Sequence, residues 1–418
     1  MKFIRILAAG LLASALCATA ACSSPPASSS ASPGSGPATS ISFLSWDNEQ
    51  TMKPLIDKFQ EENPGVTVDF SYAPPVPEYI QTLQTRLNAG TAPDVFIITA
   101  ENRIQLMDNN LVTDITNESF MSNIADAAKV PYTKDGKVYG MATSSWGGGI
   151  LYNKKLLSQV GFNDTQFASW DDFMAACQKL KDAGITPYLD AIDSVPVLLD
   201  GLLGQVNATA GGAMDEAIFS GQSSFAATWT EPLKLYDQLI QKGYMDKGAV
   251  ALTDDQVLQE FEAGRVAMIS TGSWTPAGIR SAAPDLDFSF MAVPTQSANQ
   301  TYWGGAVSPG YAINIKTEHK DAALKFLDFL QSTEAVQMYN QETGSIMTTK
   351  DFQPTVDGSL TALAQGVRDG DFYLPMSYWP KGSDQLQTEA TALLQQMVQG
   401  SLTPDQVAAG MDKKLSEL

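Results

Sequence analysis

The order of strand and helix patterns after residue 40 limits most strongly how this chain can fold. Three stretches have the alternating or continuous apolar pattern of β-strands, at residues 41–45, 66–70 and 94–98. Each is followed by apolar residues at helical spacing, near residues 52–59, 80–87 and 104–107. Three strand–helix units in succession predict a parallel sheet with right-handed crossover helices.

Strand and helix patterns continue to the end of the chain, which places it in the α/β class. Further strands are predicted at residues 150–152, 187–189, 265–269, 288–292 and 311–315. Further helices are predicted at residues 169–180, 233–240, 323–330, 384–397 and 404–415. Cys177 lies on an apolar helical stripe with Phe173 and Leu180, so we expect it to be buried.

Charge and residue counts exclude several classes of function. The formal net charge is −20, and a surface this acidic repels phosphate backbones, so we expect no nucleic-acid partner. His319 is the single histidine, which rules out multi-histidine zinc sites and argues against a Ser-His-Asp enzyme. The cysteines, Cys17, Cys22 and Cys177, fit no metal-binding spacing. We therefore expect neither a metal nor a cofactor.

The N-terminus has the pattern of an export signal. Residues 1–21 combine Lys2 and Arg5 with an apolar run and small residues at its end, as in a signal peptide. Cys22 follows at once and resembles the lipid-carrying cysteine of bacterial lipoproteins. Residues 22–40 are almost entirely Ser, Pro, Ala, Gly and Thr, which predicts a tether. A lipid anchor on the outer face of the cytoplasmic membrane follows; the alternative is a plain secreted protein.

Aromatic and polar side chains gather in predicted loops after strands, where open α/β sheets bind ligands. The candidates by position are Trp46, Asp47, Asn48, Glu101, Asn102, Trp146, Trp274, Trp303, Gly305, Tyr378 and Trp379. An indole ring fits the apolar face of a sugar, and carboxyl or amide groups bond its hydroxyls. The pattern thus predicts a carbohydrate site, although one loop tryptophan by itself more often covers a core. Trp170 and Trp229 adjoin helix starts and are predicted to pack, and Gly147–Gly149 is interpreted as a flexible joint.

Four motifs in order resemble one protein family. They are Gly90-Thr-Ala-Pro-Asp-Val-Phe-Ile-Ile98, Tyr139-Gly-Met through Leu151-Tyr-Asn-Lys-Lys155, Phe261-Glu-Ala-Gly-Arg-Val-Ala-Met268, and Gly305 to Leu330. Together they resemble the extracellular solute-binding proteins of ABC importers, in the carbohydrate-binding group related to maltose-binding protein.

The resemblance implies a periplasmic-binding-protein fold of type II, with two discontinuous α/β lobes and a ligand cleft between them. It implies a first lobe of residues 41–143 and 292–331 and a second of 144–291 and 332–418. Crossings are expected near Thr143–Gly149, Asp287–Ala292 and Gln331–Ala335. Glu101, Asn102 and the Trp46–Asn48 loop would contact sugar from the first lobe, and Trp274 and Trp379 from the second, with Asp193 near a further contact.

The function implied is that of a lipid-anchored, monomeric receptor that has no catalytic residue, binds a mono- or oligosaccharide and delivers it to a membrane permease. Two alternatives remain open at this point. Loops with tryptophans and acids also describe glycoside hydrolases, which need two carboxylates at a set distance. The solute could instead be of another class, such as a peptide.

Overall fold

The structure is a computed structural model that describes residues 39–163, 166–295, 301–353 and 355–418. The predicted signal peptide, most of the tether and Cys22 lie outside the described residues. Strand β1 (Thr39–Ser45) already includes the last two residues of the predicted tether, because Thr39 and Ser40 pair with Val66 and Thr67. Among the helices described, none is long and apolar enough to cross a membrane.

The smaller of the two main sheets has five strands within the described residues, in the order β2-β1-β3-β12-β6. Its other strands are β2 (Val66–Tyr72), β3 (Val95–Ile98), β6 (Met141–Ala142) and β12 (Gly310–Ile313). β1 runs parallel to β2 and β3, which confirms the predicted parallel units, whereas β12 is antiparallel to both of its neighbours. All four residues of β3 are buried, as expected for a strand covered on both faces.

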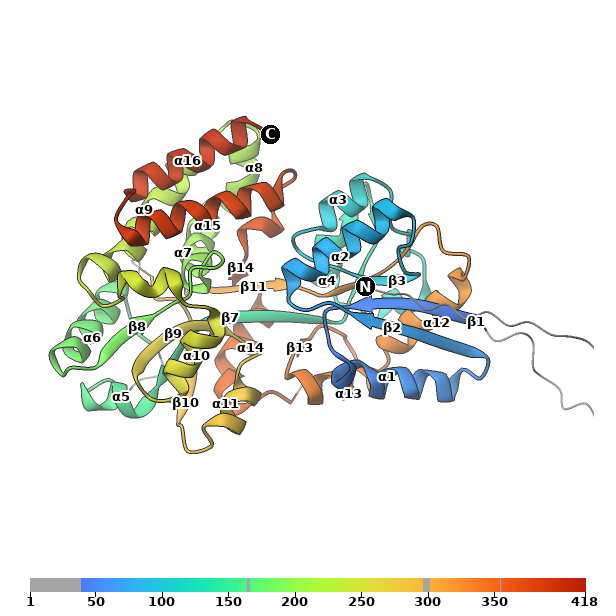
Figure 1. Cartoon of the computed structure of the whole chain (residues 1–418), viewed down its shortest axis with the longest axis horizontal. Helices are drawn as coiled ribbons and strands as arrows, with labels where there is room; N and C mark the ends of the chain where they lie inside the picture. The colour runs from blue at the N-terminus through green and yellow to red at the C-terminus, as the bar shows by residue number, and fades with distance from the viewer. Residues whose placement is uncertain (1–38, 164–165, 296–300, 354) are drawn as a thin grey trace, which may run out of the picture. The chain divides into compact units, whose positions relative to one another are not determined.

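Helices cover both faces of this sheet. They are α1 (Glu49–Glu62), α2 (Val76–Ala89), α3 (Arg103–Asp108), α4 (Asp126–Lys129), α12 (Lys320–Leu330) and α13 (Thr333–Thr343). Figure 1 shows α1 and α13 on one side and α2 and α3 on the other. The predicted apolar stripe of α1, Met52 to Phe59, is buried in the core that these elements share. We call this sheet and its helices the first lobe.

The larger sheet has seven strands within the described residues and is organised around β7 (Ser144–Asn153). The others are β8 (Thr186–Leu189), β9 (Val266–Gly272), β10 (Phe288–Met291), β11 (Trp303–Val307), β13 (Ile346–Met347) and β14 (Phe372–Tyr373). β7 is antiparallel to β9, β10, β11 and β13, which pair with different parts of its length.

The remaining helices pack on the larger sheet or on the helices that cover it, and we call the sheet and these helices the second lobe (Figure 1). They are α5 (Lys154–Gln159), α6 (Trp170–Asp182), α7 (Val197–Thr209), α8 (Met214–Phe219), α9 (Phe225–Gln241), α10 (Asp254–Glu262), α11 (Pro276–Ala282), α14 (Thr361–Asp369), α15 (Ser383–Gln399) and α16 (Pro404–Ser416). Cys177, Trp170 and Trp229 are all buried in its core, as predicted.

The chain crosses between the lobes at places that partly differ from the sequence prediction. The first crossing, at Thr143 between β6 and β7, falls within the predicted range. The second lies at Ser308–Pro309, not at Asp287–Ala292, because β11 pairs with β7 and the next strand, β12, pairs with β3. The third follows α13, whose buried residues pack in the first-lobe core. Residues 303–307 therefore belong with the second lobe, and α13 belongs with the first.

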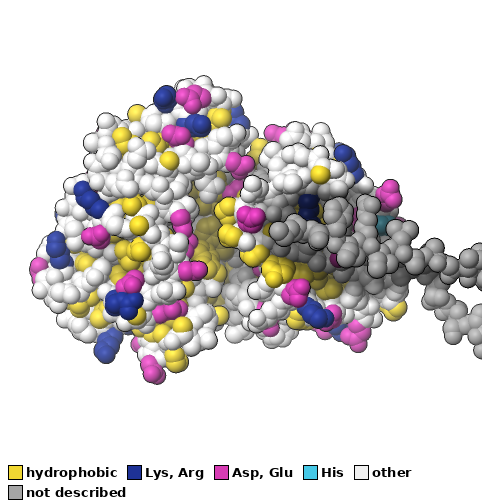
Figure 2. All heavy atoms as spheres, viewed as in Figure 1, with side chains coloured by type: hydrophobic (Ala, Val, Ile, Leu, Met, Phe, Trp, Pro, Cys, Tyr) yellow, Lys and Arg dark blue, Asp and Glu magenta, His cyan; other side chains and the backbone are white. Residues whose placement is uncertain are grey.

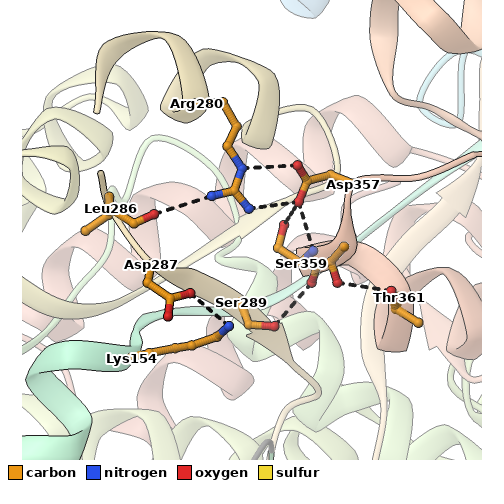
Figure 3. Close-up of polar contacts among 9 residues, drawn as sticks. Lys154, Arg280, Leu286, Asp287, Ser289, Asp357, Ser359 and Thr361 are labelled. Carbon is orange, nitrogen blue, oxygen red and sulfur yellow. Dashed lines mark hydrogen bonds and ion pairs between the residues drawn. The ribbon is translucent and has the colours of Figure 1, made fainter. Parts of the chain in front are cut away.

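A polar cluster fixes α11 to the segment before the short helix η4 (Gly358–Leu360) in the second lobe (Figure 3). Arg280 donates two hydrogen bonds to the Asp357 carboxylate, at 3.2 and 3.1 Å. The guanidinium also lies 4.0 Å from the centre of the Phe288 ring. Asp357 accepts further bonds from the backbone and hydroxyl of Ser359. The hydrogen bond from Arg280 is the main cause that lowers the pKa of Asp357 to about 2.

Candidate ligand-binding site

The loop that follows β1 places two predicted site residues next to each other. Trp46 is partly exposed, and its ring meets the Tyr79 ring edge-on with centroids 5.9 Å apart. Asp47 is partly exposed and accepts a hydrogen bond from the Tyr339 hydroxyl of α13 at 3.1 Å. Burial raises the pKa of Asp47 to about 6, and its hydrogen bonds oppose that rise. The carboxyl group is thus held in one position by a neighbour.

Asn48, in the same loop, has a local structural role. Its Oδ1 atom accepts a hydrogen bond from the backbone N–H of Thr51 at 3.1 Å and caps α1. An N-cap of this kind satisfies a backbone donor that the first helical turn leaves free. The cap explains Asn48, and we leave it out of the proposed site.

In the loop that follows β3, one predicted site residue is buried and another is partly exposed. Asn102 is buried, and it exchanges two hydrogen bonds with Thr99, at 2.8 and 3.2 Å, which close the turn. Glu101 is partly exposed. Burial raises the pKa of Glu101, Arg103 opposes this change, and Asp384 of α15 adds to it. Since α15 belongs to the second lobe, Glu101 lies where the two lobes face each other.

Two tryptophan rings stand together on the second lobe. Trp146 lies in β7 and Trp274 follows β9, and their ring centroids are 5.6 Å apart with the planes at 74°. Trp274 is 53% exposed. A Cβ atom added at Gly272 would lie 2.0 Å from the Trp274 ring, so only glycine leaves room for the ring there. Trp274 therefore offers an open aromatic face that is supported from beneath.

Tyr378 offers a second open ring on the second lobe, and its neighbour Trp379 does not. Tyr378 is 47% exposed and stacks on Tyr373 with centroids 5.2 Å apart. Trp379 is fully buried, and its indole N–H donates to Asp215 at 3.1 Å, beside the Tyr373 hydroxyl at 2.6 Å. Burial raises the pKa of Asp215 to about 6. The prediction that Trp379 stacks on a sugar is corrected, because its ring is enclosed in the core.

Trp303 is also a core residue. It begins β11 and is 5% exposed, and its ring covers positions Gly149 and Gly366, where an added Cβ would lie 2.7 and 2.2 Å from ring atoms. This corrects its prediction as a ligand contact. Gly305 is buried next to the carbonyl group of Trp146, and a Cβ atom added at Gly305 would lie 2.7 Å from that carbonyl oxygen. Gly305 therefore allows close strand packing.

The glycine run Gly147–Gly149 is part of a regular strand. Gly148 pairs with Gly304 of β11 on one side and with Gly272 of β9 on the other. An added Cβ at Gly148 would lie 2.6 Å from the Thr271 carbonyl oxygen. The interpretation as a flexible joint is therefore wrong, since these glycines let three backbones pack closely.

Asp193 is exposed and lies near another acid. Burial is the main cause that raises the pKa of Asp254 to about 6, and the nearby charge of Asp193 adds to this rise. Neither residue makes a described contact with the tryptophan pair or with Glu101. The structure thus gives no support to Asp193 as part of the same site.

The first-lobe and second-lobe groups approach each other at two places. At one place α13 ends against the second lobe: Gly344 lies next to the Ser273 carbonyl, and Ser273 precedes Trp274. Tyr339, which holds Asp47, is on the same helix. At the other place Ala100 packs into the second-lobe core. Figure 2 shows a hollow between the two lobes, with hydrophobic side chains inside it and acidic side chains near its edge.

A cavity adjoins Tyr378 on the second lobe. Its volume is about 330 Å³, and it is lined by Asn207, Ala208, Gly211, Gly212, Tyr302, Gly370, Phe372 and Tyr378. This is at the lower end of the size range of small-molecule sites. Three of its lining side chains, Tyr302, Phe372 and Tyr378, are aromatic, and Asn207 adds a polar group.

Several residues near these groups were not predicted from the sequence, among them Tyr339, Asp384 and Arg103. Tyr339 and Asp384 lie on helices far along the chain from their partners, and no motif marks them. Arg103 has one feature in the sequence that could have drawn attention to it, because it is a charged residue at the start of the apolar stripe of α3. Among the described residues, no group of three or more His, Cys, Asp or Glu side chains could hold a metal ion.

These groups together can bind a ligand that has both apolar faces and hydroxyl groups. Open indole and phenol rings fit the faces of a sugar. Carboxyl groups accept hydrogen bonds from its hydroxyls, and these bonds are strong because the acceptor is charged. The arrangement therefore suits a carbohydrate and requires no metal ion.

Comparison with known protein families gives a match over most of the described chain. The family profile of the bacterial extracellular solute-binding proteins matches residues 45–337. The multiple sugar-binding protein of Streptococcus mutans is 24% identical over 348 residues, which cover 81% of this chain and 81% of that protein.

Solved structures with the same fold cover nearly the whole chain. A family 1 extracellular solute-binding protein from Bifidobacterium longum subsp. infantis is 30% identical, with a TM-score of 0.78, and the match covers 92% of this chain and 100% of that one. A sugar transporter protein of Bacillus licheniformis in complex with stachyose is 18% identical, with a TM-score of 0.72 and coverage of 91% and 100%. The second similarity concerns the fold alone.

Proposed function

Because this chain belongs to the bacterial extracellular solute-binding proteins, we propose that it captures a mono- or oligosaccharide for an ABC importer. The observation that carries this proposal is the open Trp274 ring, which packs against Trp146. Trp274 lies next to the end of α13, and Tyr339 of that helix donates a hydrogen bond to Asp47. The sugar-binding relatives reported above support the same ligand class. The family is one of binding proteins and not of enzymes, so the glycoside hydrolase alternative is set aside.

The proposed mechanism is capture by both lobes. A ligand stabilises the arrangement of lobes that gives it more contacts, by the difference in its affinity for the two arrangements. A sugar bound to Asp47 or Glu101 on the first lobe and to Trp274 or Tyr378 on the second would hold the lobes together. Hinge closure of this kind is general among periplasmic binding proteins. The closed, sugar-loaded monomer would then deliver its ligand to the permease subunits.

We further propose that Cys22 carries the lipid that anchors the protein to the outer face of the cytoplasmic membrane. The support is the sequence alone, in which small residues precede Cys22 and a Ser/Pro-rich stretch follows it. The test is phase partition of the mature protein in detergent, with Cys22→Ser as the variant. Recovery of wild-type protein in the aqueous phase would refute the anchor and leave the binding proposal untouched.

Calorimetry and tryptophan fluorescence on the wild-type protein test the binding proposal. The ligands are a panel of neutral mono- and oligosaccharides that includes stachyose, with a peptide mixture as comparison. We expect saturable binding of at least one sugar, with a change in tryptophan emission because Trp274 and Trp146 would lose contact with water. Binding of peptides with no response to any sugar would refute the proposed ligand class.

A further inference from the structure

Arg103 is a buried arginine whose hydrogen-bonding capacity is not fully used by the described residues. It begins α3 and is 3% exposed. Its Nε atom has no hydrogen-bond partner, and no carboxylate among the described residues forms an ion pair with its guanidinium group. Native proteins rarely leave such groups unsatisfied, because burial of an unpaired charge is strongly unfavourable. An unsatisfied buried group of this kind is therefore a candidate for contact with something that binds later.

The position of Arg103 is at the boundary between the lobes. Its electrostatic neighbours are Tyr132 and Glu101 on the first lobe and Tyr378 on the second. Ala100, three residues earlier, packs into the second-lobe core. Tyr378 is the half-exposed ring that stacks on Tyr373 and lines the cavity of about 330 Å³. A ligand unit stacked on Tyr378 would therefore lie close to the guanidinium group.

The charges around Arg103 indicate what kind of group it binds. Glu101 and Asp384 are acidic side chains at this place: Glu101 acts on Arg103, and Asp384 adds to the rise in the pKa of Glu101. Two carboxylates against one guanidinium group leave a local excess of negative charge. An anionic ligand would be repelled by the two acids, whereas a hydroxyl accepts from Arg103 and donates to Glu101 at the same time. The surroundings thus favour an uncharged ligand that is rich in hydroxyl groups.

We propose that Arg103 is a ligand-binding residue that donates hydrogen bonds to neighbouring hydroxyls of an uncharged sugar unit stacked on Tyr378. The proposal rests on the proposed function and specifies its ligand, which is neutral at this end of the site. A bound sugar would give the guanidinium group acceptors that the described residues do not supply. The planar fork of an arginine side chain suits two adjacent oxygens better than a lysine does.

The test uses the sugar that binds the wild-type protein most tightly. Arg103→Gln and Arg103→Met are compared by calorimetry with Arg368→Gln, which alters an exposed arginine on α14. We expect the two Arg103 variants to bind about 10- to 100-fold more weakly, the range for lost hydrogen bonds to a charged group. Arg368→Gln should bind as the wild type does. Affinity of the folded Arg103 variants within twofold of wild type would overturn the proposal.

Thermal melting without sugar separates a binding role from a structural one. Replacing an unpaired buried charge with an apolar side chain of similar length removes an unfavourable interaction, so Arg103→Met should melt at the same temperature as wild type or higher. A lower melting temperature together with unchanged sugar affinity would show a structural role and overturn the proposal.

A charged ligand tests the neutral part of the proposal. The matching sugar with a uronic acid unit should bind the wild type at least about tenfold more weakly, because of the acids beside Arg103. Tighter binding of the uronic acid sugar would overturn it. Failure of every sugar to bind the wild type would instead refute the proposed function, so the two failures are distinguishable.

Discussion

Replacement of Trp274 with alanine should weaken sugar binding while the protein stays folded. A tryptophan side chain presents about 250 Å² when fully exposed. With 53% of Trp274 open, roughly 130 Å² are available, and a pyranose on one face would cover about half of this area. At about 25 cal/mol per Å², counting only the indole surface, the loss is ~1.6 kcal/mol, or about 15-fold in affinity. The loss of the edge-on contact with Trp146 should lower stability by roughly 0.5–1.5 kcal/mol.

The assay is calorimetric titration with the best sugar ligand, together with thermal melting of each protein. Ile315→Ala is the control, because Ile315 is a similarly exposed apolar residue, at 49%, just beyond β12, where Ile313 pairs with Val95 at the end of β3 that is opposite to the Glu101 loop. Trp274→Phe should give a smaller loss of affinity than alanine, since part of the flat surface remains. An affinity of Trp274→Ala within twofold of wild type would show that no sugar lies on this ring.

Three further predictions test individual assignments. Asn48→Ala should lower the free energy of unfolding by about 1 kcal/mol through loss of the α1 cap and leave sugar affinity unchanged; a clear loss of affinity in folded protein would return Asn48 to the site. Trp379→Phe should destabilise the protein by about 2–4 kcal/mol, because Asp215 loses a buried donor, with no change in affinity at temperatures where it is folded; weaker binding by that folded variant would argue against a purely structural role. Asp357→Asn should lower stability at pH 7 by at most about 1 kcal/mol, since the pair with Arg280 is partly exposed. The folded pKa of Asp357, about 2, is below its unfolded value of 3.8, so its stabilisation is complete above pH 4 and is lost as pH falls through 2. Chemical denaturation of wild type and variant across this pH range should show the difference shrink toward zero, and a constant difference would contradict the ion-pair account.

The regular elements of the fold were predictable from local patterns. The apolar run at Val95–Ile98 and the stripe of α1 were recognised because their periodicity reflects burial on a sheet or helix face. The crossing at Ser308–Pro309 was not recognised, because β11 and β12 are short and adjacent in sequence. Only their pairing with different sheets separates them, and pairing is a property of distant residues.

The site was predictable in part, and the errors have a common physical cause. Trp274 and Trp379 both lie in predicted loops, yet Trp274 is half exposed and Trp379 is enclosed in the core. The difference comes from Asp215, which lies more than 150 residues before Trp379 and binds its indole N–H. The glycine run Gly147–Gly149 resembles a flexible joint in the sequence, although neighbouring strands lie too close there for any side chain. Local sequence carries no record of these distant neighbours.

The pairing of β7 has a consequence for how the lobes can move. Its backbone hydrogen bonds join it to β9, β10, β11 and β13, so bending it would break several ladders at once. If the lobes rotate as proposed, we expect the backbone to bend at the residues that flank these ladders, such as Thr143 and Ser308. We therefore expect the amide hydrogens of β7 to exchange slowly whether sugar is bound or not, as in a rigid strand that keeps its pairing while the lobes move around it.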